Sequence, residues 1–148
     1  MSNAVDVLIV EDEMLLAMDI EAMVEDSGHR VLAEAACLQD VEDLPADIAP
    51  HLAFVDLHLA HGSNGLDVCR LIQQRWPDTL IVFVTANVSK IPDHFAGGHG
   101  VIAKPFSHAG VVNAIRYLAE GVLDPPPSVP LPSSFVPSAN LQRRWATA

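Results

Sequence analysis

The sequence predicts an α/β protein built on a doubly wound parallel sheet, and three observations favour this class. Short apolar runs alternate five times with segments that have helical spacing. Runs that are apolar at nearly every position are typical of parallel strands covered by helices on both faces. The connections between the runs are short, which favours right-handed crossovers within one sheet. A chain of 148 residues is long enough to give one such domain a full core.

The first unit begins with an apolar strand over Val5–Val10, which leads directly into the acids Glu11, Asp12 and Glu13. Acids at this point have two explanations, and both can hold. Negative charge in the first turn of the next helix stabilises it by about 0.3–1 kcal/mol. Clustered carboxylates also bind cations. Glu13 suits the helix, whereas Glu11 and Asp12 suit a cation site.

The other elements follow from the same patterns. A helix over Met14–Asp26 carries apolar residues on one face and ends near Gly28, a natural C-cap. Further strands are expected over Val31–Ala36, from Leu52 to Asp56, over Leu80–Val84 and over Val101–Ala103. Further helices are expected over Gln39–Leu44, over Leu66–Trp76 and from the N-cap Ser107 to about Gly121.

The segment Val88–Gly100 has the weakest helical pattern of the chain. It contains one proline and three glycines, and each of these residues lowers helix stability. We expect a short or partly unwound helix there.

The domain is expected to span residues 5–121, and residues 122–148 have a different character. Asp124–Ala148 contains six prolines and few charges, so it cannot build a core of its own. We expect this segment to be disordered, or to be docked on a surface through Phe135 or Trp145.

Composition excludes several classes of protein. The formal net charge is −11, which argues against nucleic-acid partners, because a phosphate backbone requires clustered Lys and Arg. No apolar run approaches the roughly 20 residues of a membrane helix, so no membrane association is expected. Cys37 and Cys69 have no CxxC spacing, which indicates buried thiols in a reducing, cytoplasmic setting.

Polar groups end four of the predicted strands. Glu11 and Asp12 follow the first strand, and Asp56, Thr85 and Lys104 follow the third, fourth and fifth. Parallel strands present all their carboxyl ends at one edge of the sheet, where open α/β sheets bind ligands. Taken singly, each residue has a plainer explanation, such as a turn cap, a hydroxyl bonded to backbone or a surface ammonium. Together, three carboxylates either raise a pKa or bind a cation, and hard oxygen ligands suit Mg²⁺.

The motifs Glu11-Asp12, Val55-Asp56, Thr85-Ala86 and Lys104-Pro105-Phe106 occur in this order, each at a strand end. As a set they resemble the receiver domain of two-component response regulators, over about residues 5–121. The resemblance implies a flavodoxin-like (βα)5 fold with strand order 2-1-3-4-5. It also implies a cis peptide bond between the lysine and the proline of the last motif.

The resemblance assigns a metal site. By analogy with the family, Asp12, Asp56 and the backbone carbonyl of His58 would bind Mg²⁺ directly, and Glu11 would contribute through water.

The resemblance also implies phosphoryl chemistry. Asp56 would accept a phosphoryl group from a histidine kinase or a histidine phosphotransferase, and Thr85 and Lys104 would contact the phosphoryl oxygens. Their rearrangement would report phosphorylation to the face formed by helix 4, strand 5 and helix 5, which is also a possible homodimer interface. Val101 stands where the family usually has an aromatic switch residue, and the interval from Thr85 to Lys104 is short for the family.

We therefore expect a phosphorylation-driven switch with no separate effector domain and no enzymatic role. Two other hypotheses stay open. One is a phosphorylation-independent pseudo-receiver that acts as a protein-binding module. The other is a phosphatase with an aspartate nucleophile, which would require a second acid where His58 stands. A transition-metal pair of His58 and His61 is a further alternative to two solvated loop histidines.

Overall fold

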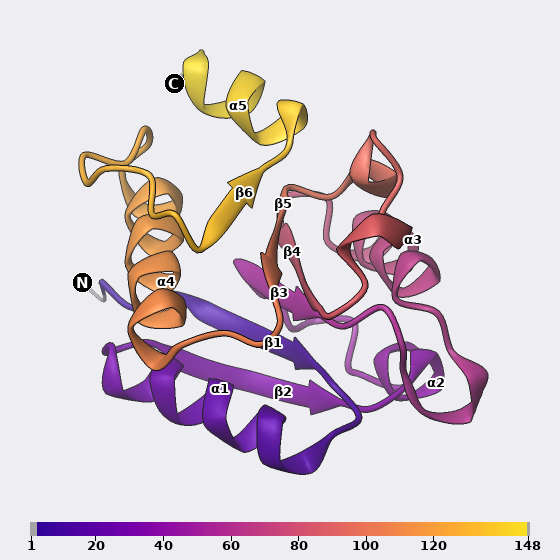
Figure 1. The fold of residues 1–148 in the computed structure, drawn as a ribbon. Coiled ribbons are helices and arrows are strands. Elements are labelled where there is room, and N and C mark those ends of the chain that lie inside the picture. The colour runs from indigo at the N-terminus through magenta and orange to yellow at the C-terminus, as the bar shows by residue number, and fades with distance from the viewer. Residues whose placement is uncertain (1–2, 148) are drawn as a thin grey trace.

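A six-stranded sheet forms the centre of the computed structural model, which describes residues 3–147 (Figure 1). The strands are β1 (Asp6–Val10), β2 (Arg30–Ala35), β3 (Leu52–Val55), β4 (Leu80–Thr85), β5 (Gly100–Ala103) and β6 (Phe135–Pro137). They lie in the order β2-β1-β3-β4-β5-β6, and the first five are parallel. The predicted fold class and the predicted order of five strands are therefore confirmed. The sixth strand was not predicted, and it pairs antiparallel with β5.

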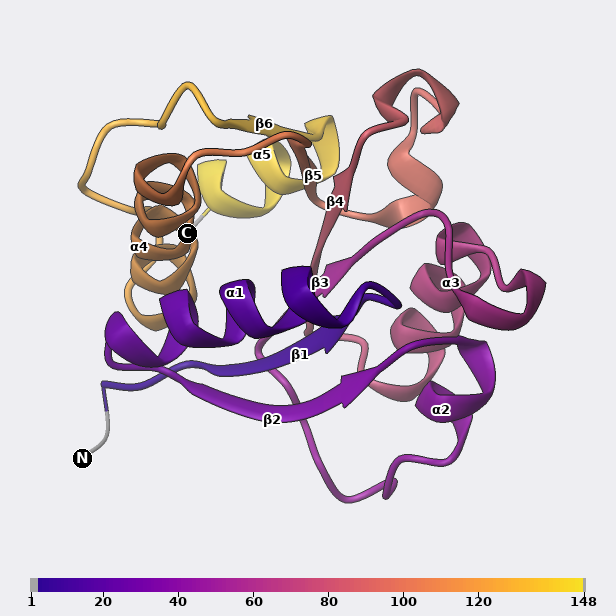
Figure 2. The same ribbon diagram turned by 60° about the horizontal axis from the view of Figure 1, so that its bottom comes forward.

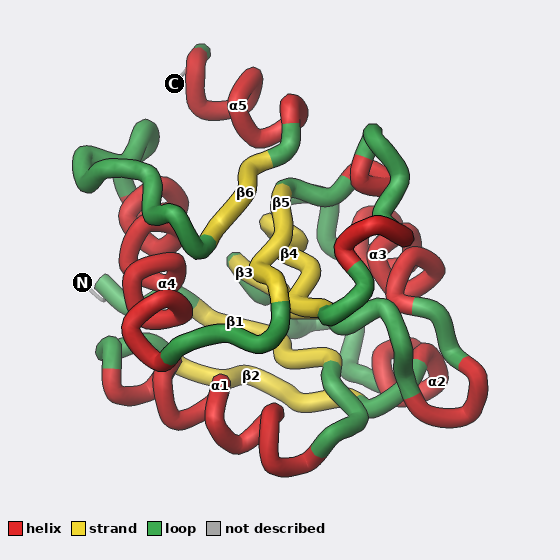
Figure 3. The backbone as a smooth tube through the Cα atoms, viewed as in Figure 1, coloured by secondary structure: helices red, strands yellow, loops and turns green. Residues whose placement is uncertain are grey.

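Helices cover both faces of this sheet, as the tube view also shows (Figures 2 and 3). The helices α1 (Met14–Asp26) and α4 (His108–Leu123) pack on one face, and α2 (Leu38–Glu42) and α3 (Gly65–Arg75) pack on the other. The helix α5 (Ala139–Ala146) follows β6. The connections include three 3-10 turns, η1 (Ala60–Gly62), η2 (Val88–Lys90) and η3 (Phe95–Gly97). Within residues 3–147, no helix is long and apolar enough to cross a bilayer.

The apolar strands divide their side chains between two cores. Val7 and Ile9 of β1 point towards α1 and α4, whereas Leu8 and Val10 point towards α2 and α3. Side chains alternate along a strand, so a central strand needs apolar residues at every position to fill both cores. This requirement explains the apolar runs of the sequence. Cys37 and Cys69 are buried free thiols, as predicted.

The connection from β4 to β5 contains no α-helix among its residues, all of which the structure describes. It contains the turns η2 and η3 instead, in agreement with the expected short or unwound helix. Phe95, Ala96 and Gly97 adopt left-handed conformations with φ of 55°, 50° and 85°. A left-handed conformation costs about 1–2 kcal/mol for a residue with a side chain. The turn is held from α3 by Gln73, whose amide nitrogen donates a hydrogen bond to the carbonyl of Ala96 at 2.7 Å.

For residues 122–148 the sequence leaves disorder and surface docking open, and the structure has β6 and α5 docked on the domain. Phe135 and Trp145 are 2% and 7% exposed, and both belong to the core under α1 and α4. Ala148 lies outside the described residues. A strand of three residues that ends in proline has no periodicity of its own, so only its pairing with β5 defines it.

Candidate functional site

The carboxyl ends of β1, β3, β4 and β5 lie at one edge of the sheet, where the predicted site residues follow their strands. Glu11 comes directly after β1 and Asp56 directly after β3. Thr85 is the last residue of β4, and Lys104 comes directly after β5. The register of the parallel pairs sets Val10 beside Val55 and Thr85 beside Ala103. Adjacent strands therefore end at nearly the same level.

Lys104 connects two of the carboxylates. Its ammonium Nζ donates a hydrogen bond to Glu11 Oε1 at 2.6 Å and to Asp56 Oδ2 at 3.0 Å. Glu11 and Asp56 are only 6% and 8% exposed. Buried carboxylates require such charged partners, because desolvation of an unpaired charge is costly. The peptide bond between Lys104 and Pro105 is cis, as the resemblance implies.

Burial and pairing set the ionisation of this group in opposite directions. Burial raises the pKa of Glu11 above its usual value, although hydrogen bonds from Lys104 and from the backbone N–H of Glu13 oppose the rise. Burial alone would lower the pKa of Lys104, but its hydrogen bonds with Glu11 and Asp56 outweigh that effect and raise it. Lys104 is therefore firmly cationic.

Asp12 completes a cluster of three carboxylates. Oxygens of Glu11, Asp12 and Asp56 all lie within 4.8 Å of one another, and Asp12 is the exposed member. Among residues 3–147 this is the group of three or more acidic, His or Cys side chains that has the spacing of a metal site. A set of carboxylate oxygens with one side open to water fits Mg²⁺, which keeps several waters when it binds.

Thr85 is fully buried, and the structure shows only backbone partners for it among the described contacts. Its hydroxyl accepts a hydrogen bond from the N–H of Asn87 at 3.1 Å, and its carbonyl accepts one from the N–H of Lys104 at 2.9 Å. Thr85 is thus tied to Lys104 through backbone. A contact of its hydroxyl with a phosphoryl group stays a prediction.

The two histidines near the site lie in the loop after β3. His58 is exposed and forms an isolated antiparallel bridge with Asn64. His61 is exposed and adopts a left-handed conformation within η1. Neither belongs to the cluster of three carboxylates, and the role of the His58 carbonyl in metal binding stays a prediction.

Sequence reasoning did not identify Gly65, which lies at the start of α3 against the backbone of Asp56. A Cβ atom on Gly65 would lie 2.8 Å from the carbonyl carbon of Asp56 and nearer still to its oxygen. The glycine after the Asp56 loop was a possible signal, but only the fold shows what it contacts.

Comparison with known proteins fits this geometry. The model of the response regulator receiver domain family matches residues 7–116. The chain belongs to this family. This confirms the resemblance inferred from the four motifs, and the receiver match begins within β1, includes β2 to β5 and ends within α4.

Relatives of this receiver are bacterial regulators. The chain is 36% identical over 114 residues to the phyllosphere-induced regulator PhyR of Methylorubrum extorquens, covering 73% of this chain and 41% of PhyR. It is 32% identical over 139 residues to the photosynthetic apparatus regulatory protein RegA of Cereibacter sphaeroides, covering 92% of this chain and 73% of RegA. The chain thus spans less than half of the length of PhyR.

Solved receivers have the same fold. The solution structure of the PhyR receiver domain from Erythrobacter litoralis matches with a TM-score of 0.67 and 28% identity, covering 85% of this chain and 97% of that one. The response regulator PhyR from Brucella abortus matches with a TM-score of 0.64 and 31% identity, covering 78% of this chain and 47% of that one.

Proposed function

We propose that this receiver is a phosphorylation-driven switch that accepts a phosphoryl group on Asp56 in a reaction that depends on Mg²⁺. The observation that carries the proposal is the position of Lys104, which contacts Glu11 and Asp56 at once beside Asp12. Such a site holds a nucleophilic carboxylate, a fixed cation and a set of metal ligands in one place. Phosphoryl transfer depends mainly on this kind of positioning and charge stabilisation.

Each residue of the site has its own role in the proposed phosphoryl transfer. A carboxylate oxygen of Asp56 forms the new O–P bond, while the P–N bond of a phosphohistidine donor breaks and its electron pair returns to the imidazole nitrogen. Lys104 and Thr85 hold phosphoryl oxygens, and Lys104 offsets their charge. Glu11, Asp12, Asp56 and the carbonyl of His58 would hold Mg²⁺, which neutralises negative charge between the donor and the acceptor.

The donor is a histidine kinase or a histidine phosphotransferase. Met14, Leu15 and Met18 support this part of the proposal, because they are 75%, 77% and 54% exposed at the start of α1. Exposed apolar side chains gathered beside an acidic site indicate a surface for a protein partner. A protein donor that docks there would place its phosphohistidine over Asp12 and Asp56.

The proposed role is that of a cytoplasmic switch rather than of an enzyme with a separate substrate. A phosphatase of the aspartate class would use a second acid where this chain has His58. A homodimer through η2, β5 and α4 is a second part of the proposed output.

Intact-mass spectrometry tests the proposal. The protein is incubated with acetyl phosphate, with and without Mg²⁺, as wild type, Asp56→Ala and Asp67→Asn. Asp67 is a matched control, because it is an exposed aspartate on the adjacent helix that pairs with Arg70. We expect one phosphoryl gain that requires Mg²⁺, is lost in Asp56→Ala and persists in Asp67→Asn. No gain in the wild type, even with a kinase supplied, would refute the proposal and favour a phosphorylation-independent binding module.

A further inference from the structure

The C-terminal residues 124–146, called here the C-terminal strap, cover the edge of β5 and one side of α4. Within the strap, β6 pairs with β5, setting Phe135 opposite Ile102 and Pro137 opposite Gly100. Phe135, Leu141 and Trp145 are almost fully buried in the core shared with α4. The strap therefore covers an edge of β5 that would otherwise face solvent or a partner. Lys104 directly follows this strand.

Two glycines of the domain make room for the strap. A Cβ atom on Gly100 of β5 would lie 2.6 Å from the carbonyl oxygen of Val136 and would overlap the ring of Phe135. A Cβ atom on Gly121 of α4 would lie 2.8 Å from Cε2 of the Trp145 indole and nearer still to other ring atoms. Glycine inside a helix costs about 1 kcal/mol relative to alanine, so Gly121 lowers the stability of α4 at the point where Trp145 packs. The two glycines thus make the surface of the domain complementary to the strap.

The strap also bonds to the chain between Thr85 and Lys104, the two residues proposed to contact the phosphoryl group. The Ser138 hydroxyl donates to the carbonyl of Gly98 at 3.0 Å, and its N–H donates to the carbonyl of His99 at 3.0 Å. The amide nitrogen of Asn140 donates to the carbonyl of Gly97 at 3.1 Å. Gly97 is the last residue of the turn η3, and Gly98 and His99 are the next two residues. The strap thus helps to hold a strained segment in place.

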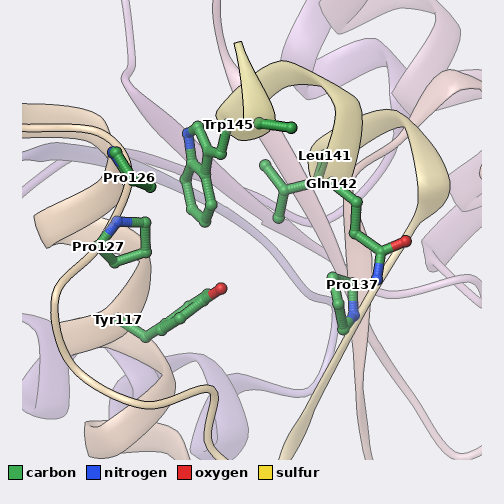
Figure 4. Close-up of a pocket in the computed structure, with 8 residues that line it drawn as sticks. Tyr117, Pro126, Pro127, Pro137, Leu141, Gln142 and Trp145 are labelled. Carbon is green, nitrogen blue, oxygen red and sulfur yellow. The ribbon is translucent and has the colours of Figure 1, made fainter. Parts of the chain in front are cut away.

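A hollow of about 440 Å³ opens to the surface of the strap beside α4, and Figure 4 shows the side chains of Tyr117, Pro127, Leu141 and Trp145 around it. Tyr117 is the lining residue that α4 contributes. Tyr117 touches the strap through its ring, with ring centres 5.6 Å from Trp145 and 6.0 Å from Phe135. The link from α4 to β6 contains no helix or strand among its described residues. A segment at the edge of a sheet that is joined by an irregular link opens locally more readily than the central strands do.

We propose that the C-terminal strap is an internal switch element, docked when Asp56 is unmodified and released when Asp56 is phosphorylated. The inference rests on the proposed phosphorylation of Asp56. A phosphoryl group on Asp56 ends the direct contact between its carboxylate oxygen and Lys104, so Lys104 and the end of β5 take a new position. One edge of β5 pairs with β4 and the other edge pairs with β6. The segment between Thr85 and Lys104 also accepts hydrogen bonds from Ser138 and Asn140. A shift of β5 therefore breaks the bonds that hold the strap, and a homodimer through this face requires that release.

Hydrogen exchange measured by mass spectrometry on the full chain tests the inference. Samples with Mg²⁺ are compared with and without acetyl phosphate, and the intact mass of each sample is recorded in parallel. We expect peptides from residues 133–146 to exchange at least about fivefold faster in the phosphorylated protein, while peptides from α1 are unchanged. Unchanged exchange in a sample that carries the phosphoryl group would overturn the strap inference alone. Absence of any phosphoryl gain would overturn the proposed function and the strap inference with it.

A reciprocal test uses variants that loosen the strap. Gly121→Ala favours helix α4 but expels the indole of Trp145, and Ser138→Ala removes the bond to Gly98. The matched control is Ser133→Ala, an exposed serine of the same segment. Because coupling between equilibria is reciprocal, a loosened strap should raise the affinity for beryllofluoride, a non-covalent analogue of the phosphoryl group, several-fold in the presence of Mg²⁺, and the control should not. Circular dichroism checks that each variant is folded. Faster exchange of the strap with an unchanged affinity for beryllofluoride, in either variant, would overturn the coupling.

Discussion

Gly65→Ala tests directly whether the backbone of Asp56 must stay where this structure places it. A Cβ atom at Gly65 would lie 2.8 Å from both the carbonyl carbon of Asp56 and Cα of Leu57, whereas ordinary van der Waals contact begins at 3.4 Å. The neighbours are backbone atoms, so they cannot rotate away as a side chain would. The Asp56 loop and the start of α3 must separate by at least about 0.6 Å.

The expected cost has two parts. Forcing an extra methyl into a packed site lowers the free energy of unfolding by about 1–3 kcal/mol. The displacement also moves Asp56, the proposed phosphoacceptor, away from Lys104 and the proposed metal ligands. Since a misplacement of about 1 Å can cost about 100-fold in rate, we expect phosphorylation by acetyl phosphate to slow by at least about tenfold. Urea denaturation measures the first effect, and the time course of the intact mass measures the second.

Gly62→Ala is the matched control for this variant. Gly62 lies in the same loop at φ +70°, and a Cβ atom there would meet nothing within 4 Å. Alanine in a left-handed conformation costs about 1–2 kcal/mol, so the control loses stability without pushing on Asp56. Equal phosphorylation rates in Gly65→Ala and wild type would refute the reasoning. If phosphorylation slows equally in both variants, the cause is lost stability and not a displacement of Asp56.

Three further predictions follow from the charges of the molecule. Mg²⁺ at about ten times its dissociation constant should raise the free energy of unfolding by about 1.4 kcal/mol, and Asp12→Asn should remove most of that gain; an equal gain in both proteins would contradict the metal site. Lys104→Met should strengthen binding of Mg²⁺ and weaken phosphorylation, because it removes a positive charge from beside Asp56; a loss of both would indicate a purely structural role for the lysine. Burial and the Arg144 guanidinium lower the pKa of His99 to about 4, and its neutral ring accepts the N–H of Ile81 at 2.9 Å. In the unfolded chain, His99 takes up a proton near pH 6.5. The contribution of neutral His99 to the free energy of unfolding is therefore complete above that pH, and the free energy of unfolding falls by up to about 3 kcal/mol as the pH drops towards 4. Urea denaturation between pH 4 and 7 should show this slope in the wild type and a flatter one in His99→Gln, and identical slopes would contradict it.

The sequence was sufficient for the parallel sheet and for most of the site, for a physical reason. The apolar runs before Glu11, Asp56 and Lys104 must be buried on both faces, and burial of that kind places the residues at one edge of one sheet. Residue types and chain order therefore determined the constellation. The close contact of Lys104 with Glu11 as well as Asp56 could not be predicted, because it depends on side-chain conformations.

Sequence reasoning did not predict how the C-terminal strap packs, because the pairing of β6 with β5 joins segments that are distant in the sequence. β6 has three residues, and α5 exposes most of its surface apart from Leu141 and Trp145. β6 has no pattern that would predict it in isolation, whereas α5 has an N-cap at Ser138 and apolar residues four positions apart, a helical signal that sequence reasoning missed. Both pack where they do because distant glycines, Gly100 and Gly121, leave space for Phe135 and Trp145.

The position of Lys104 connects the charge of the site to the edge of the sheet. When Glu11, Asp12 and Asp56 are ionised, the single ammonium of Lys104 cannot neutralise them, so the site favours a divalent cation, and the proposed phosphoryl group would add still more negative charge. Lys104 would then divide its hydrogen bonds among more oxygens than it now contacts. Lys104 directly follows β5, whose other edge is bonded to β6. In the proposed switch, a change of charge at the carboxyl end of this four-residue strand would therefore act on the segment that pairs with its edge.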